Sequence, residues 1–136
     1  MEKMIKYPSV EKIIEYNLLA LTVIKVKKAD RSEVLSRGKL DYTVAGCKEL
    51  EGDLYDKAVY LFKTLIQLHP FASGNRRTAF IVTKDFLTEN GGNFNIEDNP
   101  IQAQVMLGIR ENYYLDEELK EWIKNGKIKD FKRFEK

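Results

Sequence analysis

The only histidine of the chain, His69, opens a short segment rich in groups that move protons or bind phosphate. An imidazole titrates near neutral pH and can take a proton from an attacking hydroxyl, which makes His69 a candidate general base. Arg76 and Arg77 follow in the same segment, and guanidinium groups bind phosphate oxygens through paired hydrogen bonds. The segment therefore predicts a site that joins a proton acceptor to an anion pocket.

Two segments with helical apolar periodicity flank this site, Asp53–Leu68 and Gly74–Asn90. Pro70 disfavours helical geometry at the residue before it, so we expect the first helix to close at His69. We expect the second helix to begin near Gly74 or Asn75 and to end at the glycine-rich stop Asn90-Gly91-Gly92. The expected arrangement is a helix, a tight loop and a second helix, with His69 on one side of the loop and free backbone N–H groups on the other.

The two arginines fall in the first turn of the second helix, where the helix dipole disfavours cations. Their presence there is explained if an anion joins them. Ser73 and Gly74 are small enough to let that anion approach, while Asn75 and the exposed N–H groups add donors. The alternative is an ordinary exposed helix start with solvated arginines and a surface histidine. These residues alone leave both interpretations open.

The segment resembles the signature of the Fic/Doc family, His-x-Phe-x-(Asp/Glu)-(Gly/Ala)-Asn-(Gly/Lys)-Arg. Five typed positions match at the same spacing: His69, Phe71, Gly74, Asn75 and Arg77. The continuation Arg77-Thr78-Ala79 is similar to the Doc branch. Two positions depart. Ser73 stands where the family has the acidic residue that holds Mg²⁺, and Arg76 stands where Doc-like members have lysine and Fic enzymes glycine.

The resemblance implies a role for each matching residue. His69 corresponds to the general base that deprotonates a Ser, Thr or Tyr hydroxyl of a target protein. Phe71 corresponds to the residue buried beneath the loop, where it holds the loop's shape. Gly74 and Asn75, with the backbone after them, correspond to the anion hole around the phosphates. Arg77 corresponds to the arginine that stabilises phosphate charge.

The remaining positions of the motif bear on the type of reaction. Arg76 replaces a phosphate-contacting lysine and keeps its charge in a bulkier, forked form. Fic enzymes usually have a second arginine at the position of Phe80, whereas Doc-like members have an apolar residue there. Fic enzymes transfer the nucleotidyl group of a nucleoside triphosphate, and Doc-type members its terminal phosphate. The resemblance thus implies a transferase nearer to Doc that uses ATP or another nucleoside triphosphate. It also implies the toxin of a toxin–antitoxin pair, with an antitoxin protein as partner.

Ser73 opens an alternative to catalysis. A neutral hydroxyl is a much weaker Mg²⁺ ligand than a carboxylate, and the sequence identifies no replacement. The alternative is a catalytically degenerate Fic-fold module that binds nucleotide or a protein without chemistry. Regulation by the inhibitory motif of many Fic proteins, (Ser/Thr)-x-x-x-Glu-(Gly/Asn), is not expected, because no Ser or Thr here has Glu four residues later.

The composition suits one compact domain, 1–136. The chain is 43% hydrophobic and 32% charged, and its net charge of +2 argues against a dedicated nucleic-acid binder. No apolar run approaches the ~20 residues that span a membrane. The one cysteine, Cys47, excludes an intramolecular disulfide and fits a reducing cytosol, so we expect a cytoplasmic protein.

The whole pattern predicts an all-α bundle of about six helices. Outside the motif, we expect Ser9 to cap the first helix, Asp53 to cap the third, Pro100 to lie in the first turn of the fifth, and acidic residues from Asp116 to open the last. Lys25–Lys28 is expected to be a solvated helix end.

Two regions are less regular. Val34 and Leu35 could lie on a short helix that ends at Arg37-Gly38. By resemblance, Leu40–Cys47 is the candidate for a small β-hairpin flap that docks the target segment, and an ordinary helix connection is the alternative. We expect the tail, Lys127–Lys136, to be a frayed helix that packs its aromatic residues on the body, or else a docking surface.

Overall fold

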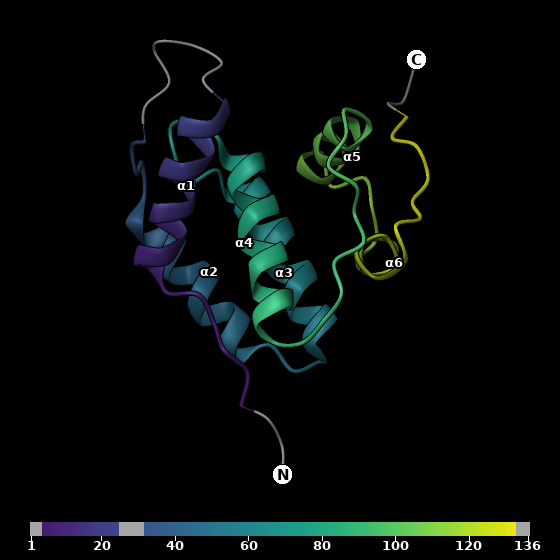
Figure 1. Ribbon diagram of the computed structural model, residues 1–136, viewed down its shortest axis with the longest axis horizontal. Helices are drawn as coiled ribbons and strands as arrows, with labels where there is room; N and C mark the ends of the chain where they lie inside the picture. Colours follow the sequence, from purple (N-terminus) through teal and green to yellow (C-terminus); the bar gives the residue numbers. More distant parts are fainter. Residues whose placement is uncertain (1–3, 25–31, 133–136) are drawn as a thin grey trace.

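Six helices make up the fold in the computed structural model, which describes residues 4–24 and 32–132 (Figure 1). In chain order they are α1 (Val10–Ile24), α2 (Arg37–Glu49), α3 (Leu54–Leu68), α4 (Asn75–Glu89), α5 (Ile101–Arg110) and α6 (Asp116–Asn125). Within these described ranges the only pairing of extended backbone is an isolated antiparallel bridge between Val34 and Phe71. The all-α class and the number of helices predicted from the sequence are confirmed.

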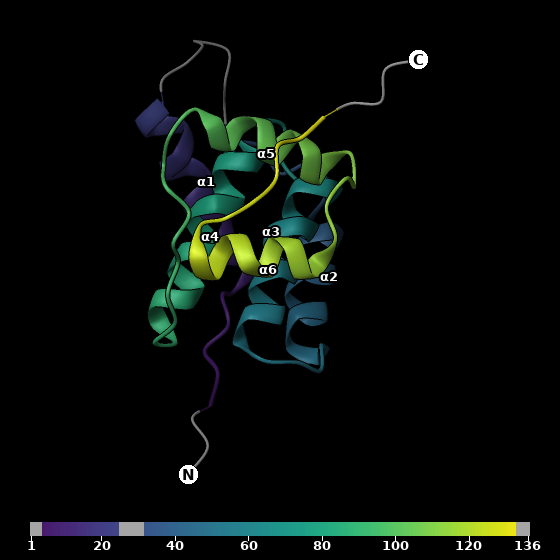
Figure 2. The ribbon, with the colours of Figure 1, turned by 90° about the vertical axis from the view of Figure 1, so that its right-hand side faces the viewer.

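Helix α3 lies at the centre of the molecule and packs against α2, α4, α5 and α6, while α1 packs against α4. Figure 1 shows α1 to α4 running side by side, and Figure 2 shows α5 and α6 lying across them. The core is apolar and drawn from all six helices, with Phe62 and Leu65 of α3 almost completely buried. The central pair α3–α4 carries the loop that contains His69.

Local capping fixes several helix boundaries as the sequence predicts. Asp53 accepts a hydrogen bond from the Asp56 backbone N–H (2.9 Å), and the Asp56 side chain accepts one from the Asp53 N–H (2.8 Å). This reciprocal pair satisfies two backbone donors at the start of α3. At the start of α1, the Ser9 hydroxyl accepts from the Lys12 N–H (3.1 Å). Helix α6 ends at Gly126 in the left-handed conformation that suits a glycine C-cap.

The predicted flap at Leu40–Cys47 is wrong, because these residues lie inside α2. Three residues spaced as on one helix face, Leu40, Val44 and Cys47, are buried in the core. Their burial outweighs the preference of this stretch for extended backbone. The ordinary helical alternative holds, and nothing in the described residues forms a hairpin there.

The short helix predicted around Val34 and Leu35 is also wrong. This stretch is extended, and the Leu35 N–H donates to the Pro70 carbonyl (2.8 Å). Helix α2 begins only after Ser36, whose hydroxyl accepts from the Lys39 N–H (3.2 Å). The residues expected to end a helix instead begin one.

The tail is not helical in its described part, residues 127–132, so that expectation is wrong. Its packing prediction holds for Phe131, which is half-buried against Tyr113 with ring centroids 5.1 Å apart. The Tyr114 hydroxyl also donates to the Lys129 carbonyl (2.9 Å). Phe134 and the Lys25–Lys28 run lie outside the described residues. Among the helices that the structure describes, none has the length and apolarity needed to cross a membrane.

Candidate functional site

His69 ends α3 in a left-handed backbone conformation, with φ 53° and ψ 59°. Its side chain is exposed. Partial desolvation lowers the pKa of the imidazole, and the positive charges of Arg110, Lys39 and Arg76 lower it further. Lowering the pKa increases the share of neutral imidazole at pH 7, and the neutral form is the one that a general base requires.

The loop after His69 is held by Asn75, which reaches back over it. The Asn75 Oδ1 accepts from the Phe71 N–H (3.0 Å), and its Nδ2 donates to the Phe71 carbonyl (2.8 Å). Phe71 is completely buried and Asn75 nearly so. These two bonds close the five-residue segment from Phe71 to Asn75, so the Asn75 side chain holds the loop while its backbone begins α4.

A second clamp on the loop comes from the extended stretch before α2. The Leu35 and Ser36 N–H groups donate to the Pro70 carbonyl (2.8 and 3.2 Å), and the Ala72 N–H donates to the Glu33 carbonyl (2.9 Å). These bonds pair residues 33–36 with residues 70–72. Because both sides of the loop are bonded, the position of His69 is set by backbone geometry as well as by the end of α3.

Gly74 is the N-cap residue that directly precedes α4, and it adopts a left-handed conformation with φ 76°. No side chain caps this helix, and no residue in the described ranges accepts a hydrogen bond from the N–H groups of Asn75, Arg76 or Arg77. Uncapped N–H groups and the helix dipole together favour an anion at this end of α4. Ser73, just before Gly74, is half-buried, and its carbonyl accepts a hydrogen bond from Asn17 of α1 (2.9 Å).

The two arginines differ in their surroundings. Arg76 is exposed and makes no ion pair within the described part of the chain. Arg77 forms a bidentate pair with Asp98, with Nη1–Oδ1 and Nη2–Oδ2 distances of 2.7 and 2.8 Å, and its guanidinium lies over the Phe80 ring (5.2 Å to the centroid). Hydrogen bonds from Arg77 lower the pKa of the Asp98 carboxyl.

Both arginines line a pocket of about 450 Å³ between the start of α4 and the start of α5. Pro100, Ala103 and Met106 form its apolar wall. The pocket joins a cationic end to an apolar surface, an arrangement suited to an anion that carries an organic group. A residue predicted to lie in the first turn of α5, Pro100, instead directly precedes the helix and lines this pocket.

The donor set of this site does not suit Mg²⁺. Ser73 supplies a neutral hydroxyl, and its backbone carbonyl already accepts from Asn17. The nearby carboxylate, Asp98, has both oxygens on Arg77. Across the described residues, no group of three or more His, Cys, Asp or Glu side chains could hold a metal ion. Because Mg²⁺ prefers anionic oxygen ligands, the side chains of this site do not supply a binding place for it.

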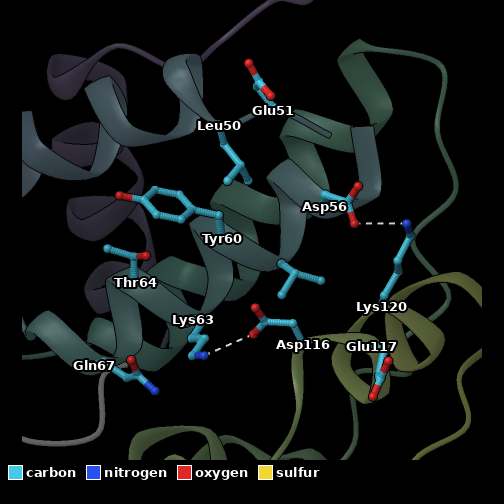
Figure 3. Close-up of a pocket in the computed structure, with 11 residues that line it drawn as sticks. Leu50, Glu51, Asp56, Tyr60, Lys63, Thr64, Gln67, Asp116, Glu117 and Lys120 are labelled. Atoms are coloured by element: carbon cyan, nitrogen blue, oxygen red, sulfur yellow. Dashed lines mark hydrogen bonds and ion pairs between the residues drawn. The ribbon is translucent and has the colours of Figure 1, made fainter. Parts of the chain in front are cut away.

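A larger pocket of about 660 Å³ lies along the outward face of α3, towards α6 (Figure 3). It contains none of the residues predicted for the site. Its two cations are already neutralised, because Lys63 pairs with Asp116 (3.0 Å) and Lys120 with Asp56 (2.9 Å). The larger volume of this pocket therefore does not make it the candidate functional site. The smaller pocket lined by Arg76 and Arg77 has the cationic groups that bind phosphate.

The structure brings the predicted residues together on one loop and one helix start: His69, Phe71, Ser73, Gly74, Asn75, Arg76 and Arg77. The sequence analysis missed two side chains that bond to them, Asn17 and Asp98. Asn17 could have been noticed because it is a polar residue in the apolar stripe of a predicted helix, where a buried amide needs a hydrogen-bond partner. Asp98 gave no such signal, because nothing in the sequence links it to Arg77, 21 residues before it.

Comparison with curated proteins gave no match. A family model described as the Fic/DOC family matches residues 1–87, which include α1 to α3, the loop and most of α4. The matched region holds His69, the clamped loop and the uncapped helix start with its two arginines. Because this match spans more than half of the chain, the chain belongs to the Fic/DOC family.

Proposed function

We propose that this protein is a Doc-like transferase that moves a phosphate or nucleotidyl group from ATP, or another nucleoside triphosphate, to a hydroxyl of a target protein. Family membership suggests a transferase of the AMPylation or phosphotransfer type. The single observation that carries the proposal is the position of His69 on a hydrogen-bonded loop that leads into the uncapped, arginine-bearing start of α4.

In the proposed reaction, His69 takes the proton of a Ser, Thr or Tyr hydroxyl as its oxygen attacks phosphorus. A new O–P bond forms and the bond to the leaving group breaks. Attack on the terminal phosphate releases the nucleoside diphosphate, and attack on the phosphate next to the ribose releases pyrophosphate. The N–H groups at the start of α4, with Arg76 and Arg77, stabilise the charge on the phosphate oxygens.

Placement near the Doc branch is supported by Phe80, which is buried where Fic enzymes have a second arginine. Its ring lies under the Arg77 guanidinium. One arginine fewer at the phosphates favours transfer of the terminal phosphate over nucleotidyl transfer. A Doc-like role further makes the protein the toxin of a toxin–antitoxin pair, with a separate antitoxin as its partner.

The test is mass spectrometry of lysate proteins after incubation with the purified protein and ATP, with and without added Mg²⁺. A gain of about 80 Da marks phosphate transfer, and a gain of about 329 Da marks nucleotidyl transfer. The matched control is His69→Asn, because asparagine tolerates the left-handed backbone of this position better than alanine does. A gain that persists in His69→Asn contradicts the role of the imidazole.

A degenerate binding module is the second candidate, and Ser73 is the observation that favours it, because it replaces the family's acidic residue. This candidate expects nucleotide binding without a modified product under all metal conditions. Ser73→Asp restores the usual carboxylate at that position. A product formed by Ser73→Asp but not by the wild type would identify a degenerate site on an intact scaffold.

The toxin assignment has its own test. Expression of the wild type is expected to arrest growth of a bacterial host, and expression of His69→Asn is not. Equal growth of both strains contradicts a toxic role without contradicting transfer in vitro.

A further inference from the structure

Asn17 is a completely buried side chain of α1 that the proposed reaction does not use. Its Nδ2 donates to the Ser73 carbonyl (2.9 Å) and to the Thr78 hydroxyl (3.1 Å), and its Oδ1 accepts from the Ser32 hydroxyl (2.9 Å). One amide thus joins α1, the stretch before α2, the loop and α4. Both of its N–H donors are used, so the side chain has one fixed orientation.

The position of Asn17 would ordinarily take an apolar residue. It belongs to the inward stripe of α1, whose other buried members are Val10, Ile13 and Ala20. Burial of an amide is unfavourable unless its hydrogen bonds are made inside the protein. Leucine would fill such a position without that requirement, so the choice of asparagine follows from what it bonds.

The bond to Ser73 sets the orientation of one peptide group. A trans peptide is planar, and its C=O and N–H point in opposite directions. Because Asn17 draws the Ser73 carbonyl towards α1, the N–H of Gly74 points away from α1. No residue in the described ranges accepts a hydrogen bond from this N–H. It comes directly before the uncapped N–H groups of α4.

Gly74 also packs against Asn17 and its neighbour on α1, Leu21. A Cβ atom at Gly74 would lie 3.0 Å from Leu21 Cδ2 and 3.3 Å from Asn17 Nδ2. The chain at this point therefore lies directly on α1, and its positive φ together with these close contacts favours glycine. The Ser73–Gly74 peptide therefore packs against α1, through Asn17 and Leu21.

We propose that Asn17 is a positioning residue that locks the Ser73–Gly74 peptide so that its N–H, like the uncapped N–H groups at the start of α4, is available to a bound phosphate. Without this bond the peptide can turn over, which would place a carbonyl oxygen where the phosphate binds. Asn17 then controls anion binding without touching the ligand. This inference rests on the proposed function, since it needs phosphate to bind at the start of α4.

The experiment compares two nearly isosteric variants with inorganic tripolyphosphate as the probe. Asn17→Leu removes the bond to Ser73 and keeps the volume of the side chain. Thr78→Val removes only the neighbouring bond of the same Nδ2 and leaves the Ser73 bond in place. Binding is measured by titration calorimetry, and urea unfolding of each variant reports its loss of stability.

We expect Asn17→Leu to weaken tripolyphosphate binding about tenfold or more, as loss of an anion-hole donor does, and Thr78→Val to bind within about twofold of the wild type. A purely structural role would instead weaken binding in both variants in step with their loss of stability. Equal binding by Asn17→Leu and the wild type overturns the inference and leaves the proposed function intact. A wild type that binds no tripolyphosphate overturns both.

A second measurement needs no variant and covers the case in which Asn17→Leu does not fold. In the wild type, the ¹H–¹⁵N signal of Gly74 is followed as tripolyphosphate is added. A downfield proton shift together with those of Asn75 and Arg76 is expected, because each N–H then donates to the anion. A Gly74 signal that stays in place while Arg76 moves overturns the inference.

Discussion

The ion pair between Arg77 and Asp98 occupies the guanidinium that the proposed reaction needs. Both Nη atoms of Arg77 bond to the carboxylate, and Gln102 Nε2 donates to Asp98 Oδ1 as well (2.8 Å). A phosphate that binds Arg77 through the same fork must displace Asp98. Asp98→Asn keeps the shape of this side chain and removes the competing charge, so we expect it to raise the affinity for phosphate.

The size of this effect follows from the exposure of the pair. The side chains of Arg77 and Asp98 are 32% and 51% exposed, so solvent screens their attraction. Exposed pairs contribute about 0.2–1 kcal/mol, and the bidentate geometry places this one near the upper end. The free energy of unfolding of Asp98→Asn should fall by about 1 kcal/mol, while tripolyphosphate binds about fivefold more tightly, the same energy expressed as an affinity.

The stability difference should depend on pH. Because Arg77 lowers the pKa of the Asp98 carboxyl in the folded protein, the pair stabilises the fold fully above the ordinary carboxyl pKa of about 3.9. That stabilisation is lost as pH falls through the lower, folded-state pKa. The unfolding curves of the wild type and Asp98→Asn, measured by circular dichroism, should therefore converge in strong acid.

The assay is calorimetric titration with tripolyphosphate at pH 7, with Glu97→Gln as the matched control. Glu97 neighbours Asp98 in the chain and makes no ion pair within the described residues, so its variant removes the same charge without freeing Arg77. An equal gain in both variants would mean a general electrostatic effect. Weaker binding by Asp98→Asn would refute the reasoning, because Asp98 would then orient Arg77 for its ligand.

Three further predictions concern single residues. Because partial desolvation and nearby cations lower the pKa of His69 below 6.5, the acidic limb of kcat/KM should inflect below that pH. Between the lowered pKa of the folded state and 6.5, the unfolded state binds more protons, so the free energy of unfolding should rise with pH. Urea unfolding measured across this pH range should show a smaller rise in His69→Asn. Gly74→Ala places a side chain at φ 76° and 3.0 Å from Leu21, which should cost about 1–2 kcal/mol or more in urea unfolding; an unchanged midpoint would contradict the turn geometry. Burial raises the pKa of Cys47 to about 11, so a thiol reagent at pH 8 should label it only after denaturation, and rapid labelling of the native protein would contradict its burial.

Helix boundaries that depend on neighbouring residues could be predicted from the sequence. The Ser9 cap, the Asp53 cap and the stop before Pro70 each rest on chemistry within four residues. The motif loop was predictable for the same reason, since His69 and the start of α4 are joined by a few residues. Local capping and turn rules contain enough information to place such elements.

Features that depend on distant partners could not be predicted in this way. Leu40–Cys47 combines β-favouring residues with a helical apolar spacing, and only its burial against the core decides for the helix. The Asn17–Ser73 bond spans 56 positions and the Arg77–Asp98 pair spans 21. A single sequence gives the presence of a polar residue in a stripe or a loop but not the identity of its partner.

The bond from α1 to the loop also determines what the smallest working piece of this protein can be. The family signature lies entirely on α3, α4 and the loop between them, which together look like a self-sufficient helical hairpin. Yet one peptide of that loop is held from a helix near the other end of the chain. A fragment that begins at Asp53 would keep every signature residue and lose the support beneath Gly74. The hairpin is therefore not a portable unit, and grafting it onto another scaffold requires grafting α1 with it.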